Sequence, residues 1–314
     1  MNQGALTRAD IEAAFERIQA QVQRTPVMRS RQIDARVGAE VFFKCEHLQS
    51  AGAFKFRGAS HAIGLLGEDQ RARGVITHSS GNHAQALALA AQRAGISATI
   101  VMPRGSSPLK LAATRAYGAT VIECENTQQA RESTCKEEMA RGDQVMIHPY
   151  NDRRIIAGAG TAALELLEEV GELDALVTPV GGGGLLSGSA LAASGRCVVY
   201  GAEPRGADDA FRSLETGVRV TEQTPDTVAD GLRTCLGELN FAIIRAHVEA
   251  IGRASDDEIL AAMALVHTRM KQLIEPSSAV PLACLLNGSL PARGRIGVII
   301  SGGNLDPSSL PIAR

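Results

Sequence analysis

Short apolar runs rich in β-branched residues alternate with alanine-rich stretches of helical periodicity along this chain. The strand-like runs occupy residues 41–43, 74–77, 98–102, 120–122, 145–147, 175–177, 197–200 and 296–300, and helical stretches such as 84–94 and 155–170 lie between them. Continuously apolar strands that alternate with helices are typical of parallel sheets covered on both faces, so the pattern predicts an α/β fold. The 314 residues are about two domains' worth of chain without a low-complexity linker, so we expect two α/β lobes in close contact.

Composition and the N-terminus exclude several kinds of partner. The 32 Lys and Arg nearly balance the 34 Asp and Glu, and aromatic residues make up 3% of the chain. We therefore expect no nucleic-acid partner, because such surfaces need a basic excess or stacking platforms. The N-terminal segment MNQGALTRADIEAAFERI is too charged for a signal peptide, and no apolar run is long enough to span a membrane. The six cysteines include no CxxC pair, which favours free thiols and a cytoplasmic location.

Four consecutive glycines, Gly181, Gly182, Gly183 and Gly184, stand between a predicted strand and an alanine-rich helix. Backbone without Cβ atoms can close around a ligand with its N–H groups pointing inward, and the following helix N-terminus attracts an anion. We therefore predict a phosphate-binding loop. The segment 158–163 matches a loose dinucleotide pattern but lies inside a helical stretch, so we expect no dinucleotide site there. A nucleoside-triphosphate P-loop is absent from the sequence.

Lys55 lies between two phenylalanines, Phe54 and Phe56, and small residues surround the three. An apolar setting lowers the pKa of an amine, because burial disfavours the charged form. A neutral amine is the form that attacks a carbonyl group to form a Schiff base. Lys55 is therefore a candidate nucleophile, and a lysine extending to the surface is the alternative interpretation.

Two polar segments follow predicted strands. The segment 78–84, HSSGNHA, offers hydroxyls, an amide and backbone N–H groups at a strand-to-helix turn, which suit a carboxylate or a phenolic oxygen. By itself it could also be an ordinary helix cap. The segment 299–304, IISGGN, places the Ser301 hydroxyl after the last predicted strand. Ligands of α/β sheets bind at the carboxyl ends of the strands, so both segments are candidate binding elements.

Four segments, in their order along the chain, resemble the β-family, or fold type II, of pyridoxal phosphate enzymes. They are the Lys55 segment, segment 78–84, the glycine loop and segment 299–304. Within that family the chain is most similar to the serine/threonine dehydratases and serine racemases, from Thr25 to Asn304. The resemblance implies a tryptophan synthase β-like fold of two lobes, each a mostly parallel sheet flanked by helices. It also implies a large cofactor-binding domain formed by residues 1–73 and 152–314, a small mobile domain of residues 74–151, and a homodimer.

The resemblance further implies that pyridoxal 5′-phosphate is the cofactor and that Lys55 carries it. Asn82 would contact the 3′-oxygen of the ring and Ser301 the pyridine nitrogen. The implied cofactor contacts are Phe54, Lys55, Asn82, Gly181, Gly182, Gly183, Gly184, Leu185 and Ser301. A serine does not protonate the ring nitrogen strongly, as a carboxylate partner would, so electron withdrawal into the ring is weaker. This steers a substrate carbanion toward loss of a β-leaving group.

The implied reaction is dehydration and deamination of a small β-hydroxy amino acid, such as L-threonine, L-serine or 3-hydroxyaspartate, to a 2-keto acid and ammonia. Lys55 would remove the α-proton as general base. The implied substrate-binding residues are Ser79, Ser80, Gly81, Asn82, His83 and Arg131. Arg131 would admit a second substrate carboxylate, or else it is an ordinary exposed helix residue. Serine racemase chemistry, with Lys55 and Ser80 as the two bases, is the alternative.

Two further alternatives are a β-replacement synthase and a non-catalytic binding protein. A cation site is also implied by resemblance, in the segment 201–209. Its ligands would be Glu203, the carbonyl of Ala207, and Asp209, whose oxygen atoms suit Mg²⁺ or Ca²⁺. Without the resemblance, a solvated acidic turn is the simpler interpretation of that segment.

Overall fold

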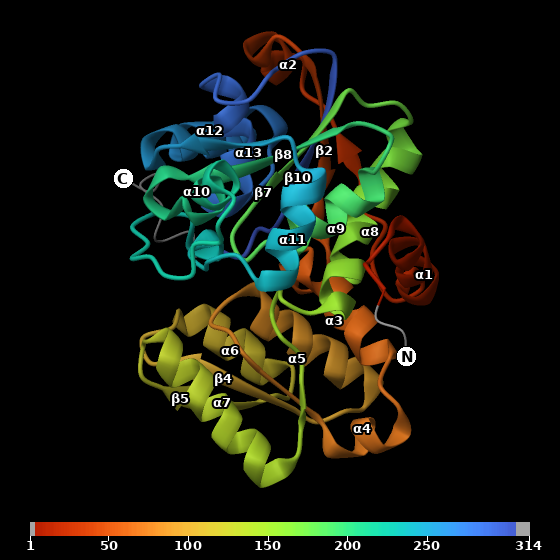
Figure 1. Cartoon of the computed structure of the whole chain (residues 1–314), viewed down its shortest axis with the longest axis vertical. Helices are drawn as coiled ribbons and strands as arrows, with labels where there is room; N and C mark the ends of the chain where they lie inside the picture. Colours follow the sequence, from red (N-terminus) through yellow and green to blue (C-terminus); the bar gives the residue numbers. More distant parts are fainter. Residues whose placement is uncertain (1–3, 306–314) are drawn as a thin grey trace.

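Two mostly parallel sheets organise the chain, and helices cover both (Figure 1). The computed structural model describes residues 4–305. The larger sheet has the order β1-β2-β10-β7-β8-β9, formed by Val27–Met28, Glu40–Cys45, Arg295–Ile300, Ala175–Pro179, Val198–Pro204 and Ala250–Ala254. The smaller sheet has the order β5-β4-β3-β6, formed by Thr120–Cys124, Ala98–Pro103, Val75–His78 and Val145–Met146. All neighbouring strands are parallel except β1 and β2, so the predicted fold class is confirmed.

Thirteen α-helices of the described residues connect and cover these strands. They are α1 Arg8–Ile18, α2 Arg31–Val37, α3 Lys55–Gly64, α4 Glu68–Arg73, α5 Asn82–Ala94, α6 Pro108–Ala116, α7 Gln128–Gly142, α8 Arg153–Val170, α9 Gly184–Ala193, α10 Asp209–Thr216, α11 Glu238–His247, α12 Asp256–Met270 and α13 Pro276–Leu286. Short 3₁₀ turns are η1 Glu46–Leu48, η2 Ser50–Gly52, η3 Arg205–Ala207 and η4 Asp230–Leu232. None of these helices is both long enough and apolar enough to cross a membrane.

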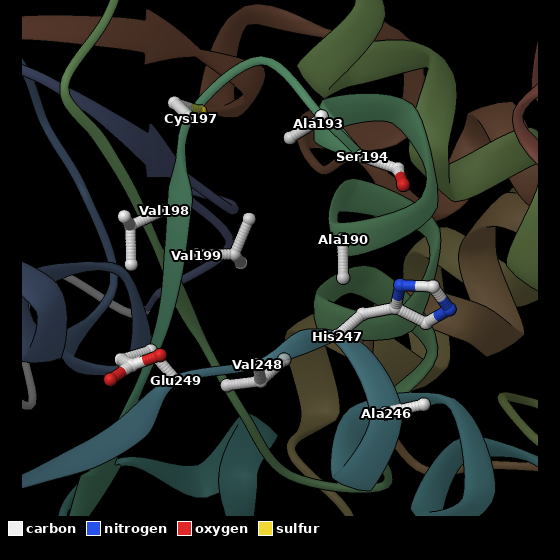
Figure 2. A pocket seen from close by; sticks show the side chains of 11 residues that line it. Ala190, Ala193, Ser194, Cys197, Val198, Val199, Ala246, His247, Val248 and Glu249 are labelled. Carbon is white, nitrogen blue, oxygen red and sulfur yellow. The ribbon is translucent and has the colours of Figure 1, made fainter.

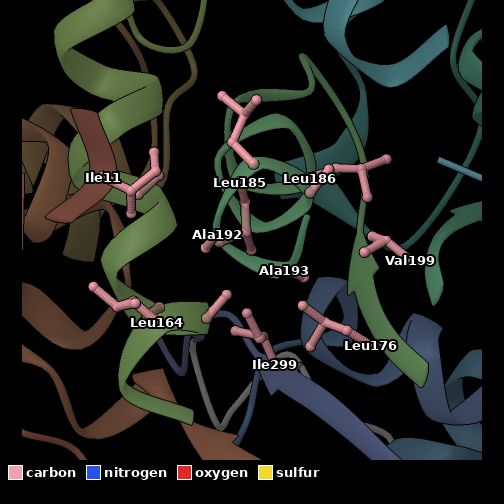
Figure 3. Close-up of a cluster of buried hydrophobic side chains, with 14 of the residues drawn as sticks. Ile11, Leu164, Leu176, Leu185, Leu186, Ala192, Ala193, Val199 and Ile299 are labelled. Atoms are coloured by element: carbon pink, nitrogen blue, oxygen red, sulfur yellow. The ribbon is translucent and has the colours of Figure 1, made fainter. Parts of the chain in front are cut away.

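The larger sheet is apolar on both faces, as its predicted burial requires. Successive strand side chains point to opposite faces. Leu176 of β7 and Ile299 of β10 pack with Leu164 of α8 and Leu186 of α9 in one cluster (Figure 3). The next residues along the two strands, such as Val298, pack in a second cluster with residues of α12 and α13. Helices therefore cover each face, and the strand ends are left as the place where a ligand can enter.

Glycines allow α3, α8 and α9 to pack with their backbones nearly in contact. A Cβ on Gly158 of α8 would lie 2.6 Å from the Cα of Gly58 in α3. A Cβ on Gly160 would lie 2.6 Å from the carbonyl oxygen of Gly188 in α9. Such distances exclude any larger residue, so the glycine pattern at 158–163 is explained by helix packing inside α8, as expected for a sequence that is not a dinucleotide loop.

A cluster of four buried charges holds the first turn of α3. The Arg57 guanidinium makes two-pronged ion pairs with Glu46, at 2.7 and 2.8 Å, and with Glu165 of α8, at 2.8 and 2.9 Å. Lys44 of β2 adds an ion pair of 2.7 Å to Glu165. All four side chains are almost completely buried. Residues two apart on a helix point in nearly opposite directions, so Arg57 anchors α3 from the side away from Lys55.

Candidate active site

The glycine loop and Ser301 lie at the same edge of the larger sheet. Strand β7 ends at Pro179, just before Gly181, and its parallel neighbour β10 ends at Ile300, just before Ser301. Neighbouring parallel strands bring their carboxyl ends together, so the two predicted cofactor elements become adjacent. This is the edge at which ligands of α/β sheets bind.

The first three glycines of the loop Gly181–Gly184 leave no room for a side chain. A Cβ on Gly182 would lie 2.3 Å from the Tyr150 ring, and one on Gly181 would lie 2.9 Å from the Cα of Leu232. Gly183 has a φ of +92°, which favours glycine. The loop leads into α9, whose first turn includes the buried Leu185. The first N–H groups of a helix lack partners within the helix, so the loop ends in the arrangement that binds phosphate groups.

Lys55 begins α3 and directs its amine across the site. Its Nζ donates a 2.9 Å hydrogen bond to the carbonyl of Pro149 and lies 5.1 Å from the centre of the Phe54 ring. Burial of the amine lowers its pKa to about 8, although the charge of Glu275 opposes this effect. The direction agrees with the expectation from the two flanking phenylalanines. A substantial fraction of the amine is therefore neutral near pH 8.

Main-chain bonds tie the Lys55 segment to the Ser301 segment. The N–H of Phe54 donates a 2.9 Å hydrogen bond to the carbonyl of Ser301, and Ala53 forms a β-bridge with Gly302. The Ser301 hydroxyl lies 3.0 Å from the Ser278 hydroxyl at the start of α13. Ser301 is almost completely buried. The structure thus places its hydroxyl in the same region as Lys55 and the glycine loop.

The segment 78–84 turns from β3 into α5 and places Asn82 against the other elements. The Asn82 amide donates a 2.8 Å hydrogen bond to Glu275 and accepts one of 3.0 Å from Asn304. A Cβ on Gly302 would lie 3.0 Å from Nδ2 of Asn82. Asn82 therefore lies beside the segment that carries Ser301.

The remaining residues of this turn differ in exposure. Ser79, Ser80 and Gly81 are partly exposed, and the Ser79 hydroxyl accepts a 3.3 Å hydrogen bond from the N–H of Gly81. His83 is buried, and its Nε2 lies 3.3 Å from the carbonyl of Ile147. Burial and the nearby Lys55 charge hold the pKa of His83 well below its usual value, so its ring is neutral. The turn can therefore offer hydroxyls and N–H groups, with His83 packed beneath it.

Arg131 is not joined to this group by any contact that we observe. It lies on α7, and its Nε donates a 3.3 Å hydrogen bond to the carbonyl of Thr127 in the same helix. Its charge nevertheless lowers the pKa of His78, which ends β3 immediately before the Ser79 turn. Arg131 thus lies within electrostatic range of the residue that precedes the Ser79 turn.

The predicted cation ligands form a separate buried acidic pair. Glu203, near the end of β8, accepts backbone hydrogen bonds of 3.0 and 2.9 Å from Ala210 and Phe211. Asp209, at the start of α10, accepts a 2.8 Å bond from the N–H of Leu236. Burial raises the pKa of Glu203 well above its usual value and that of Asp209 to about 6, and their mutual repulsion contributes to the shift of Glu203.

Glu203 and Asp209 are the two charged ligands predicted for the cation site. Ala207 lies in η3, between Glu203 and Asp209 along the chain, and is buried. Among residues 4–305, no group of three or more His, Cys, Asp or Glu side chains is arranged to hold a metal ion. A cation here would therefore need carbonyl oxygens or water in addition to two carboxylates.

Several neighbours of the site were not assigned a role by sequence reasoning. They are the carbonyl of Pro149, the Ser278 hydroxyl, the Asn304 amide and Asn240, whose Nδ2 donates a 2.7 Å hydrogen bond to the Gly182 carbonyl. The sequence signal for Ser278 is its place just after Pro276, a residue favoured at the first turn of a helix. The others have no local signal, because only the tertiary fold brings them together.

A hollow lies at the end of the strands opposite the glycine loop. It has a volume of ≈320 Å³ and lies between the end of α9, the start of β8 and the end of α11 (Figure 2). Its lining residues are Ala190, Ala193, Ser194, Gly195, Cys197, Val198, Val199, Ala246, His247, Val248 and Glu249. Because Val198 is the amino end of β8, this hollow is at the sheet edge away from the glycine loop.

Comparisons with known proteins match this geometry over almost the whole chain. Residues 18–302 match the family model described as pyridoxal-phosphate dependent enzyme. A serine racemase of Dictyostelium discoideum is 45% identical, with 97% of each chain covered. A beta-hydroxyaspartate dehydratase of Paracoccus denitrificans is 46% identical, with 97% of this chain and 98% of the relative covered. The solved structure of maize serine racemase has a TM-score of 0.95 at 42% identity, and covers 98% of this chain and 96% of that one.

Proposed function

Because the chain belongs to the pyridoxal-phosphate dependent enzymes, we propose that it dehydrates and deaminates a small β-hydroxy amino acid. L-Threonine, L-serine and 3-hydroxyaspartate are the candidate substrates, and the products are a 2-keto acid and ammonia. The observation that carries this proposal is the buried Lys55 amine, with its pKa of about 8, at the strand edge that also holds the glycine loop and Ser301. Lyase chemistry on such a substrate requires an amine that can both bind a carbonyl carbon and exchange a proton.

The residues present fit pyridoxal phosphate. The loop Gly181–Gly184, where a Cβ would collide with Tyr150 and Leu232, suits a phosphate held by backbone N–H groups. Asn82 and Ser301 offer an amide and a hydroxyl for the ring oxygen and the ring nitrogen. When bound, the cofactor supplies an aldehyde and an electron-withdrawing ring that stabilises a substrate carbanion.

The protein's own groups then perform the proton transfers. Lys55 removes the α-proton at its Nζ, the atom that donates a 2.9 Å hydrogen bond to the Pro149 carbonyl. Ser79, Gly81, Asn82 and His83 receive the substrate carboxylate at the α5 N-terminus. The neutral Ser301 hydroxyl keeps electron withdrawal weak, which favours loss of the β-hydroxyl over longer-lived carbanion chemistry.

Racemisation of serine is the second candidate. It is supported by the similarity to the Dictyostelium discoideum serine racemase and by the partly exposed Ser80 hydroxyl, which could act on the face opposite Lys55.

Arg131 is proposed to receive a second substrate carboxylate, since its charge acts on His78 beside the Ser79 turn.

We also propose a Mg²⁺ or Ca²⁺ ion at Glu203, the Ala207 carbonyl and Asp209. Two buried carboxylates that raise each other's energy are stabilised by a cation, and oxygen atoms are the ligands these ions prefer. Leu236 links this site to the glycine loop. Its N–H donates a hydrogen bond to Asp209, and its side chain would contact a Cβ on Gly183.

Three organisational proposals accompany this function. Residues 74–151, which include the smaller sheet, form a mobile domain relative to 1–73 and 152–314, since one hydrophobic cluster, formed by Ile76, Val101, Cys124 and Cys135, lies wholly within them. The enzyme is a homodimer, as proposed from family resemblance. It is cytoplasmic, in keeping with its six free cysteines.

The test is a substrate panel of L-threonine, L-serine, D-serine and both 3-hydroxyaspartates, read by keto-acid release and by chiral separation of serine. We expect keto acid from at least one L-substrate, and about 10²- to 10⁴-fold slower release from Lys55→Ala. Mainly D-serine from L-serine, with little keto acid, would establish the racemase instead. Purified protein that shows no visible absorbance band with added pyridoxal phosphate would contradict the proposal altogether.

A further inference from the structure

Glu275 is a buried carboxyl group that the proposed reaction does not use. It is 2% exposed and immediately precedes α13. Its backbone N–H donates a 3.1 Å hydrogen bond to the Gly302 carbonyl, so its main chain is held beside the Ser301 segment. Its Oε1 accepts a 2.8 Å hydrogen bond from Asn82, whereas its buried Oε2 has no hydrogen-bond partner among the described residues. A buried polar atom without a partner is costly unless a ligand or a proton satisfies it.

Glu275 determines how the Asn82 amide points. Nδ2 of Asn304 donates 3.0 Å to Oδ1 of Asn82, while Nδ2 of Asn82 donates to Glu275. A side-chain amide carries two N–H donors, so one remains for a ligand. The missing side chain of Gly302 permits this approach, because a Cβ there would lie 2.8 Å from Oε1 of Glu275. The three side chains therefore form an oriented chain in which the remaining N–H of Asn82 can donate to a ligand.

The charges that face Glu275 come from three other elements. Asp230 of η4 raises the pKa of Glu275, and Lys110 of α6 lowers it. These two groups form an ion pair with each other at 2.5 Å, so their effects on Glu275 largely oppose one another. Lys55 of α3 is also within electrostatic range of Glu275. Burial is the largest influence and raises the pKa of Glu275 to about 7, while hydrogen bonds from Asn82 and from the Asn304 backbone lower it.

We propose that Glu275 is a positioning residue that works as a neutral acid and holds Asn82 ready to donate to an anionic oxygen of the ligand. The neutral acid accepts the Asn82 N–H at Oε1 and carries its proton on Oε2. Loss of that proton places a negative charge behind the same amide and weakens binding of the ligand oxygen. This inference rests on the proposed function, because the ligand oxygen in question is the 3′-oxygen of the pyridoxal ring.

The test measures the affinity of the full-length apoprotein for pyridoxine 5′-phosphate, which lacks the aldehyde and cannot react with Lys55. Dissociation constants are obtained by equilibrium dialysis at pH 6 and pH 8.5. The variant Glu275→Gln keeps an acceptor oxygen for Asn82 but never becomes charged. We compare it with the wild type in a Lys55→Ala background, which removes the titration of the lysine. The exposed Glu222→Gln is the matched control.

We expect the two proteins to bind equally at pH 6 and the Glu275→Gln protein to bind about tenfold more tightly at pH 8.5, as one pKa unit of coupling implies. The Glu222→Gln protein should behave as the wild type at both pH values. The same affinity ratio at both pH values overturns the inference, and so does a Glu275→Gln protein that binds weakly at pH 6.

A second pair of variants tests the same inference at two residues, Asp230 and Lys110, that are not hydrogen-bonded to Glu275, Asn82 or Asn304. Asp230→Asn should move the midpoint of the alkaline loss of affinity to lower pH, because Asp230 raises the pKa of Glu275. Lys110→Met should move it to higher pH. Unchanged midpoints in both overturn the inference. If wild-type protein binds pyridoxal phosphate normally while these results fail, only this inference falls; if it binds none, the proposed function falls first.

Discussion

The backbone N–H of Phe54 donates a 2.9 Å hydrogen bond to the carbonyl of Ser301, two residues that are far apart in the sequence. This bond ties the residue before Lys55 to the residue proposed to meet the cofactor ring nitrogen. The amine and the ring contact are thus held by main chain rather than by flexible side chains. A site built in this way requires little rearrangement when its ligand binds.

The ionisation of Lys55 should control how fast the apoprotein takes up pyridoxal phosphate. Because burial lowers the amine pKa to about 8, the neutral nucleophile increases as pH rises and reaches a plateau above that value. We expect the rate, followed by stopped-flow absorbance of the lysine-bound cofactor, to rise with a midpoint near pH 8. A midpoint near the ordinary value of a free lysine would contradict the burial seen here. Turnover of Lys55→Ala holoenzyme should fall by about 10²- to 10⁴-fold.

Substituting Gly182 with alanine should impair cofactor binding. The new Cβ would lie 2.3 Å from the Tyr150 ring, so the loop or the ring must move. Overpacking of about 1–3 kcal/mol corresponds to an affinity loss of about 5- to 150-fold, which equilibrium dialysis can measure. The control is Gly67→Ala, at a glycine with no atom near its Cβ position. Equal losses in both variants would show that the effect is not specific to the loop.

Removing Arg57 should destabilise the protein strongly. The Arg57→Leu protein leaves Glu46 and Glu165 buried with too little positive charge, and breaking such pairs costs about 3–5 kcal/mol of unfolding free energy. Urea unfolding measures this, with the exposed Arg104→Ala as control, expected to change stability by less than about 1 kcal/mol. A loss as small as that of the control would mean that the cluster relaxes without Arg57.

The acidic pair should make stability depend on divalent cations and pH together. Since burial raises the pKa of Asp209 from 3.8 to about 6, the folded protein binds a proton there that the unfolded chain releases. Without a cation, this group therefore destabilises the fold as pH rises through that interval. The rise in Tm produced by Mg²⁺ should be larger at pH 7 than at pH 5, and absent in Glu203→Gln and Asp209→Asn. A Tm at pH 7 that is insensitive to both Mg²⁺ and Ca²⁺ would exclude the cation site.

Arg131 should affect substrates with a second carboxylate selectively. We expect Arg131→Leu to lower kcat/KM for 3-hydroxyaspartate by about tenfold or more, since charge-assisted hydrogen bonds contribute about 1.5–3 kcal/mol, and to change serine turnover little. Arg141→Leu, at the exposed end of the same helix, is the matched control. A parallel loss for both substrates would assign Arg131 a general role instead.

Much of the fold could be predicted because buried parallel strands are recognisable as short, continuously apolar runs in the local sequence. The eight predicted strand runs all overlap observed strands, and the helical stretches 84–94 and 155–170 lie in α5 and α8. The short β1 and the glycine-containing β9 were missed, since two residues of Val27–Met28 carry no periodicity and Gly252 weakens a strand pattern. Lys55 and the glycine loop could also be singled out, because an amine between phenylalanines and four adjacent glycines are unusual in themselves.

The amino-acid sequence by itself thus determined the strand and helix pattern, the candidate amine and the phosphate loop, because each of these features depends on residues that are neighbours in the sequence. Tertiary structure decided that Asn82 meets Glu275 and Asn304, and that Lys55 bonds Pro149. It also decided that Arg131 lies outside the hydrogen-bonded group. These relationships join residues far apart along the chain, and which of them meet depends on the order in which parallel strands assemble. Burial, and with it the pKa of each carboxyl or amine, exists only once that assembly is complete.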